Sequence, residues 1–120
     1  MKSGRVIQSY DSEYTNAIFF KKGEYIRAEV KESPWKGWMW CSNNERIYRW
    51  VPKSYIKLMD DKVNLFIFLK DYNAKELSVT KGEKLMLFYE ESDWVWVRNQ
   101  KGEEGWVPLE NVKVEGEKNG

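Results

Sequence analysis

The chain has 120 residues, of which 20 are Lys or Arg and 19 are Asp or Glu, so its formal net charge is only +1. This balance does not indicate a general electrostatic attraction to nucleic acid or to an anionic membrane. The sequence contains no His, which excludes His-based catalysis and His-ligated metal sites, and its lone Cys41 cannot form an intramolecular disulfide. We therefore expect a non-enzymatic protein without cofactor or metal, in which Cys41 is a small buried hydrophobe.

The aromatic fraction is 16%, with seven Trp and seven Tyr. More aromatic side chains are present than two small cores can hide, so some are expected at a surface used for recognition. The sequence has no apolar run long enough to span a membrane and no signal-peptide core after Met1, so the expected location is the cytoplasm.

The first half of the chain is predicted to form short strands separated by polar turns. Pro and Gly punctuate the loop at 31–37, and the Lys22-Gly23-Glu24 turn uses a glycine. The expected elements are strands at 5–10, 18–20, 25–30, 38–42, 47–51 and 56–58, with one turn of 3₁₀-helix at 52–55.

The second half is predicted to repeat this order. Residues 115–120 are predicted to be a disordered polar tail, and residues 59–62 a short linker between the halves. The expected elements are strands at 65–69, 76–79, 84–89, 94–97 and 105–107, with loops at 70–75, 90–93 and 99–102.

Two spacings indicate a tandem duplication. The pattern Trp-x-Trp-x9-Trp-Val-Pro begins at Trp38 and again at Trp94, 56 residues later. A Lys-Gly-Glu turn follows Phe20 and again Val79, 59 residues later. Each copy has short strands with frequent turns, which is typical of a small all-β barrel. The predicted domains are residues 4–58 and 63–114.

The second copy resembles the Src homology 3 (SH3) family in its run Glu76 to Glu83 (Glu-Leu-Ser-Val-Thr-Lys-Gly-Glu), its Asp93-Trp94 pair and its Gly105-x-Val107-Pro108 segment. The first copy is similar to the variant SH3 domains of bacterial proteins. The resemblance implies an all-β fold of two consecutive small five-stranded barrels. It also implies a shallow aromatic surface that binds a proline-rich segment in the polyproline II conformation, with acidic residues that accept the Arg or Lys of the segment.

The resemblance implies ligand-binding residues in both copies. The first copy keeps most of the aromatic positions, whereas the second has Ile67, Leu69 and Asn111 where the family has Tyr. Binding is therefore expected mainly in the first copy. The implied ligand-binding residues are Tyr10, Tyr14, Trp35, Trp38, Trp50, Pro52 and Tyr55 in the first copy, and Glu76, Asp93, Trp94, Trp106 and Pro108 in the second.

The alternation of residues along the strands also indicates which Trp side chains lie at a surface and which pack in the sheet. Trp38 and Trp94 are expected at a binding surface rather than in the core, because their neighbours Val95 and Val97 suit a small interior better than indole does. Trp40 and Trp96 are expected to pack on the outer sheet face. Trp50 and Trp106 fit either role.

The leading hypothesis is a monomeric adaptor, scaffold or regulatory protein that binds a protein or peptide partner, with no nucleic acid or membrane involved. Two alternatives stay open. One is a cell-wall or carbohydrate-binding module in which exposed Trp side chains stack on sugars. The other is a small barrel that stacks nucleic-acid bases on its aromatic residues.

Overall fold

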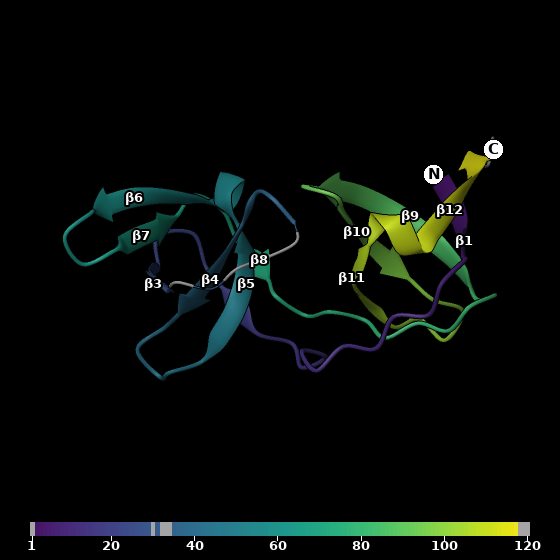
Figure 1. The fold of residues 1–120 in the computed structure, drawn as a ribbon, viewed down its shortest axis with the longest axis horizontal. Helices are drawn as coiled ribbons and strands as arrows, with labels where there is room; N and C mark the ends of the chain where they lie inside the picture. The colour runs from purple at the N-terminus through teal and green to yellow at the C-terminus, as the bar shows by residue number, and fades with distance from the viewer. Residues whose placement is uncertain (1, 30, 32–34, 118–120) are drawn as a thin grey trace. The chain divides into compact units, whose positions relative to one another are not determined.

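A computed structural model describes residues 2–29, 31 and 35–117. The predicted all-β class is confirmed, since the chain forms short strands and two single turns of 3₁₀-helix (Figure 1). The chain forms two compact units, unit 1 with residues 1–17 and 75–120, and unit 2 with residues 18–74. Within the described ranges, no helix is long and apolar enough to cross a membrane.

Unit 1 is built on one five-stranded antiparallel sheet in the order β11-β10-β9-β1-β12. The N-terminal strand β1 lies between β9 and the C-terminal strand β12, so both ends of the chain lie in this unit (Figure 1). Its elements are β1 (Lys2–Val6), β9 (Lys84–Glu91), β10 (Trp94–Arg98), β11 (Glu104–Pro108), η2 (Leu109–Asn111) and β12 (Val112–Glu117).

Unit 2 has an equivalent sheet in the order β5-β4-β3-β7-β6, and a two-stranded pair of β2 and β8. Here β7 lies between β3 and β6, as β1 lies between β9 and β12 in unit 1. Its elements are β2 (Phe19–Phe20), β3 (Tyr25–Glu29), β4 (Trp38–Ser42), β5 (Tyr48–Pro52), η1 (Lys53–Tyr55), β6 (Ile56–Asp60), β7 (Leu65–Phe68) and β8 (Tyr72–Asn73).

The two repeats therefore exchange their first strands. The strand that begins the first repeat closes unit 1, and the strand that begins the second repeat closes unit 2. In chain order, unit 2 is a circularly permuted barrel inserted between residues 17 and 75 of unit 1. The compact units consequently differ from the predicted domain ranges 4–58 and 63–114, although each unit is a small barrel-like domain as expected.

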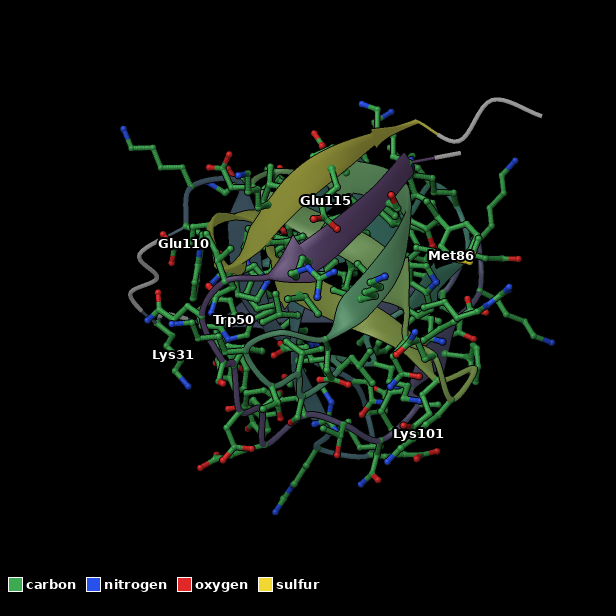
Figure 2. The ribbon with its side chains drawn as sticks, turned by 90° about the vertical axis from the view of Figure 1, so that its right-hand side faces the viewer. Lys31, Trp50, Met86, Lys101, Glu110 and Glu115 are labelled. Carbon is green, nitrogen blue, oxygen red and sulfur yellow. The ribbon has the colours of Figure 1, made fainter. Side chains whose placement is uncertain are left out.

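Two further expectations are corrected by the strand pairing. Residues 59–62 are not a linker, because β6 and β7 form an antiparallel hairpin through Asp61–Asn64 within unit 2. Residues 115–117 are not disordered, because they belong to β12 and pair with β1. Residues 118–120 of the predicted tail lie outside the described residues. Figure 2 shows Glu115 over β1, where its carboxylate pairs with Arg5 at 3.5 Å.

The core of unit 1 follows from alternation along its strands. Val95 and Val97 are buried in an aliphatic cluster together with Val6 from the exchanged strand. Gly4 lies where β1 is squeezed between its neighbours, since a Cβ added there would come within 2.9 Å of the Val112 side chain and 3.0 Å of the Lys113 carbonyl oxygen. A strand with a larger residue at this position would not fit between β9 and β12.

The core of unit 2 is more aromatic. Phe20 and Phe68 stack with ring centroids 4.9 Å apart, and Phe68 comes from the exchanged strand β7. Cys41 is fully buried in the same unit, and burial, with a smaller effect of the Glu29 carboxylate, raises the pKa of its thiol to about 12. The described structure is consistent with the expectation that Cys41 packs as an apolar residue rather than reacting as a nucleophile.

The exchange of first strands predicts the effect of removing residues 1–17. In a chain of residues 18–120, unit 2 keeps all its strands and should stay folded, whereas unit 1 loses β1 and should unfold. Amide chemical-shift dispersion would be retained for residues 35–60 and lost for residues 84–115. If the repeats folded consecutively, the opposite pattern would be seen, with residues 63–114 folded and the first repeat lost.

The burial of Cys41 predicts slow reaction with thiol reagents at pH 8, at the rate at which unit 2 opens. Because its folded pKa of about 12 lies above the ordinary value of about 8.5, the neutral thiol contributes stability below about pH 8.5, and this contribution is lost as the pH rises toward 12. The unfolding free energy of unit 2 should fall over this range more steeply than that of Cys41→Ala. Equal reaction rates in native and denatured protein would contradict the prediction.

Candidate ligand-binding surfaces

The two units repeat the same backbone hydrogen bonds around their 3₁₀ turns. The N–H of Ile7 donates to the Asn111 carbonyl oxygen at 2.8 Å in unit 1, and the N–H of Leu69 donates to the Tyr55 carbonyl oxygen at 2.8 Å in unit 2. At the other end of the turn, the N–H of Leu109 donates to Asp93 and that of Lys53 donates to Gly37. These bonds establish which residues occupy matching positions in the two units.

This correspondence corrects the residues assigned to the first strand of the second repeat. Since Ile7 matches Leu69, Gln8 matches Lys70 and Tyr10 matches Tyr72. The tyrosine pairing agrees, because Tyr10 bridges to Val79 and Tyr72 pairs with Phe20. Ile67 and Leu69 therefore do not stand at the two tyrosine positions of the family pattern. The missed residue Tyr72 could have been found from its position four residues after the buried Phe68, as Tyr10 follows Val6.

The aromatic site of unit 1, defined by Tyr10, Trp94 and Pro108, is assembled from both repeats. The Tyr10 ring packs edge-on against Trp94 with centroids 5.5 Å apart and planes at 86°. Trp94 is paired with Pro108 across β10 and β11. Tyr10 is half-buried, whereas only 5% of Trp94 is exposed. The expectation that Trp94 lies at a binding surface is therefore wrong, since Trp94 is buried and Pro108 is fully buried.

Glu76 has a different position from the one expected of an acidic ligand-binding residue. Its side chain is buried, and its Oε1 accepts hydrogen bonds from the Tyr10 hydroxyl and, at 2.8 Å, from the Ser12 hydroxyl. Burial and the hydrogen bond to Glu76 raise the pKa of Tyr10 well above its ordinary value, so its hydroxyl stays protonated and remains a donor. Glu76 therefore positions Tyr10 rather than facing solvent.

Other predicted residues lie around this site. Tyr14 is half-buried in the same segment as Tyr10, and its carbonyl oxygen accepts a hydrogen bond from the Glu76 N–H at 2.8 Å. Asp93 is exposed immediately before Trp94. Asn111 is buried, and its amide donates to the Gln8 carbonyl oxygen at 3.0 Å, which anchors η2 to the exchanged segment. An aromatic ring is therefore absent at this position, and an amide bridge takes its place.

The aromatic site of unit 2, defined by Trp38, Pro52, Tyr55 and Tyr72, also combines the two repeats. Tyr55 and Tyr72 pack edge to face with centroids 5.2 Å apart, and the Tyr72 hydroxyl donates to the Trp50 carbonyl oxygen at 2.8 Å. Trp38 is paired with Pro52 across β4 and β5. Only 8% of Trp38 is exposed and Pro52 is fully buried, so the expectation that Trp38 lies at a binding surface is also wrong.

A lysine lies on the unit 2 site. The Lys70 ammonium nitrogen is 4.0 Å from the centroid of the Tyr55 ring, a cation–π contact. Unit 1 has no aromatic ring and no cation at the matching positions, since Asn111 and Gln8 stand there. The two sites consequently differ in chemistry although their backbones match.

The predicted binding residues are thus divided differently from their order in the chain. Tyr10 and Tyr14 belong to unit 1 with Trp94, and not to the unit that contains Trp38. The structure groups Tyr10, Tyr14, Glu76, Asp93, Trp94, Trp106 and Pro108 in unit 1, and Trp35, Trp38, Trp50, Pro52 and Tyr55 in unit 2.

The remaining Trp residues form cross-strand pairs on each sheet. Trp96 lies opposite Trp106, with centroids 5.5 Å apart, and its Nε1 donates to Glu104 at 2.8 Å. This bond, followed by the hydrogen bonds from Arg98, lowers the pKa of Glu104. The unit 2 pair, Trp40 and Trp50, is half-buried, and the Lys31 ammonium lies 3.9 Å from the Trp40 centroid (Figure 2 labels Lys31 and Trp50).

The cross-strand pairs show how four Trp residues pack and how much of each stays exposed. Trp40 and Trp96 pack on the sheet against their cross-strand partners, as expected. Trp106 is 2% exposed and supports the sheet, whereas Trp50 keeps a half-exposed surface in unit 2. In the described part of the chain, no three His, Cys, Asp or Glu side chains come together as a metal site.

Comparison with known proteins gives a family match over most of the chain. The family model for the variant SH3 domain matches residues 3–59 and again residues 65–115. Comparison with curated proteins and with solved structures gives no match. The matched ranges follow the two repeats in chain order, and the exchange of first strands is a property of the folded units.

The buried hydrogen bond between Tyr10 and Glu76 predicts that Tyr10→Phe destabilises unit 1. Removing the hydroxyl leaves a buried carboxylate with one donor fewer, at a cost of about 1–3 kcal/mol. The opening free energies from hydrogen exchange at the Val95 and Val97 amides should fall by this amount. The control Tyr25→Phe changes an exposed ring and should alter stability by less than about 0.5 kcal/mol. An equal effect of both substitutions would contradict the structural role of Glu76.

Proposed function

Because the chain belongs to the variant SH3 domain family, we propose that it is a non-catalytic adaptor, scaffold or regulatory protein that binds an extended segment of a partner protein. SH3-type domains generally mediate protein interactions and are typically non-catalytic binding modules. A segment in the polyproline II conformation suits a shallow aromatic surface, since it is already extended and loses little entropy on binding.

The packing of Tyr10 against Trp94 is the observation that supports this function best. It brings the half-buried Tyr10 ring against the buried Trp94, which is paired with the buried Pro108. A proline ring of a ligand can pack on the accessible part of the Tyr10 ring. The sequence predicts binding mainly through the first copy, whereas the site proposed here uses residues of both repeats.

The charges around the unit 1 site favour a ligand with Arg or Lys. Asp93 is exposed beside Trp94, and Glu110 is exposed in η2 after Pro108. With Glu76 turned inward to Tyr10, these two carboxylates are the ones we assign to a cationic ligand side chain. The proposed ligand is therefore a proline-containing segment that carries a basic residue.

The exposure of the Trp residues gives less support to the carbohydrate alternative. Sugar stacking needs broad indole faces in solvent, whereas four of the seven Trp are buried and three are half-buried. Nor does a net charge of +1 favour the nucleic-acid alternative.

The test is an amide NMR titration of the intact protein with a Pro-x-x-Pro peptide flanked by Arg. Shifts should cluster on residues 8–14, on 93–96 and around Leu109. Replacing Asp93 and Glu110 by the residues that unit 2 has at these positions, Asp93→Gly and Glu110→Ser, should weaken binding roughly fivefold at low salt, as expected for about 1 kcal/mol from two surface charges. Asp93 has φ +69°, so glycine fits its backbone without strain.

The matched control removes two exposed acids of unit 2, with Glu45→Ser and Asp61→Ser. This variant loses the same net charge and should bind the Arg peptide as the unchanged protein does. An absence of shifts in unit 1, or an equal loss of affinity in control and test variants, would overturn the assignment of this site.

A further inference from the structure

We infer that the aromatic site of unit 2 is a second binding site, specific for an acidic extended segment, in which Lys53 and Lys70 pair with the carboxylates of the ligand. The inference rests on the proposed function for the class of ligand, an extended segment of a partner protein. It assigns to unit 2 a ligand of opposite charge to that of unit 1. The chain would then bind two different kinds of segment.

The first observation is the position of Lys70. Its ammonium is held 4.0 Å from the centroid of the Tyr55 ring, so the charge lies on the aromatic surface itself. A ligand carrying Arg or Lys would meet a like charge at this point, whereas a carboxylate would be attracted. The cation–π contact also limits the freedom of the lysine before binding, which reduces the entropy lost when a carboxylate pairs with it.

The second observation is that Lys53 lies in the same 3₁₀ turn as Tyr55, two residues before it in the chain. Lys53 begins the η1 turn that ends at Tyr55, and Lys70 follows Leu69, whose N–H donates to the Tyr55 carbonyl oxygen. Both lysine side chains are exposed. Among residues 2–29, 31 and 35–117, no carboxylate forms an ion pair with either of them. Asp71, next to Lys70, instead accepts a hydrogen bond from the Lys22 N–H at 2.8 Å.

The third observation comes from comparing matched positions in the two units. The hydrogen bonds of the 3₁₀ turns match Lys53 with Leu109 and Lys70 with Gln8. They also match Gly37 with Asp93 and, one residue after the turn begins, Ser54 with Glu110. At these four positions, unit 2 has two cations and no anion, and unit 1 has two anions and no cation. The backbone is the same, and only the charge changes sign.

The net charges of the two whole units differ in the same direction as the charges at these four positions. Nine basic against twelve acidic residues give unit 1 a net charge of −3, and eleven against seven give unit 2 a net charge of +4. The near-zero net charge of the entire chain is therefore the sum of two units whose net charges have opposite signs. An acidic segment would be attracted to unit 2 and repelled by unit 1 before any contact forms.

An acidic protein segment fits this site better than a nucleic acid does. Two lysines beside a single aromatic cluster can neutralise two carboxylates, whereas nucleic-acid affinity depends on many phosphate contacts. Tyr55 and Tyr72 are buried and packed edge to face, so a ligand at this site would be held mainly by the two exposed lysines and not by open ring faces.

The experiment titrates the intact protein with two peptides that share a Pro-x-x-Pro centre and differ only in flanking Glu or flanking Arg. The Glu peptide should shift amides of residues 53–56 and 69–72 and leave unit 1 unchanged, and its affinity should fall with added salt. Lys53→Leu with Lys70→Gln gives unit 2 the residues of unit 1. This variant should bind the Glu peptide at least fivefold more weakly at low salt and the Arg peptide unchanged.

The control variant Lys57→Gln with Lys62→Gln removes the same charge from exposed positions of β6 and the following turn, and should bind the Glu peptide normally. Shifts by the Arg peptide in unit 1 without any shift by the Glu peptide would overturn this inference and leave the proposed function intact. Shifts by the Glu peptide alone would support the inference and overturn the unit 1 assignment. Preferential binding of a single-stranded oligonucleotide at residues 53–56 and 69–72 would also overturn the inference.

Discussion

The structure depends on one constraint. The sheet of each unit is complete only when one strand lies between β9 and β12 in unit 1, or between β3 and β6 in unit 2. β1 fills this place in unit 1 and β7 fills it in unit 2. Without it, two neighbouring strands would lose their backbone partners and the core would lose Val6 or Phe68. Each repeat begins with such a strand, and this strand completes the sheet formed by the remaining strands of the other repeat. The intertwined order of the chain follows from this exchange alone.

The exchange also determines the composition of both candidate sites, because the segment that follows each first strand carries a key residue. Tyr10 and Ser12 follow β1 in the chain and therefore belong to unit 1, where they contact Glu76 and Trp94. Lys70 and Tyr72 follow β7 in the chain and therefore belong to unit 2, where they contact Tyr55. Without the exchange, Lys70 would belong to the unit that has Asp93 and Glu110, and only Lys53 would remain with Tyr55. The separation of charge between the sites is therefore a product of topology as well as of sequence.

The sequence predicts the parts of this fold that depend on local pattern. Alternation in Trp94–Val97 correctly places Val95 and Val97 in the core. The strands predicted at 38–42, 47–51, 94–97 and 105–107 are found as β4, β5, β10 and β11, within one residue at each end. It does not predict which first strand closes which barrel, since Gly4–Val6 and Leu65–Phe68 satisfy the same period and their partners lie far away in the chain. The short segment Asp61–Asn64 is compatible with either a linker or a hairpin turn. Residues 115–117 are polar because they lie in an edge strand, a composition that also fits a tail.

The insertion of unit 2 into unit 1 relates the folding of the two. Unit 1 must bring residues 2–17 together with residues 75–117, which in an unfolded chain requires closing a loop of all the residues between. For an ideal chain this closure costs on the order of 3 kcal/mol. Unit 2 is continuous, and its own fold holds the Ala74 N–H 2.9 Å from the Ile18 carbonyl oxygen, so its two ends are adjacent once it has formed. Folding of unit 2 therefore removes most of the closure cost for unit 1. It follows that the contact between Tyr10 and Trp94 depends on the stability of a domain that contains neither residue.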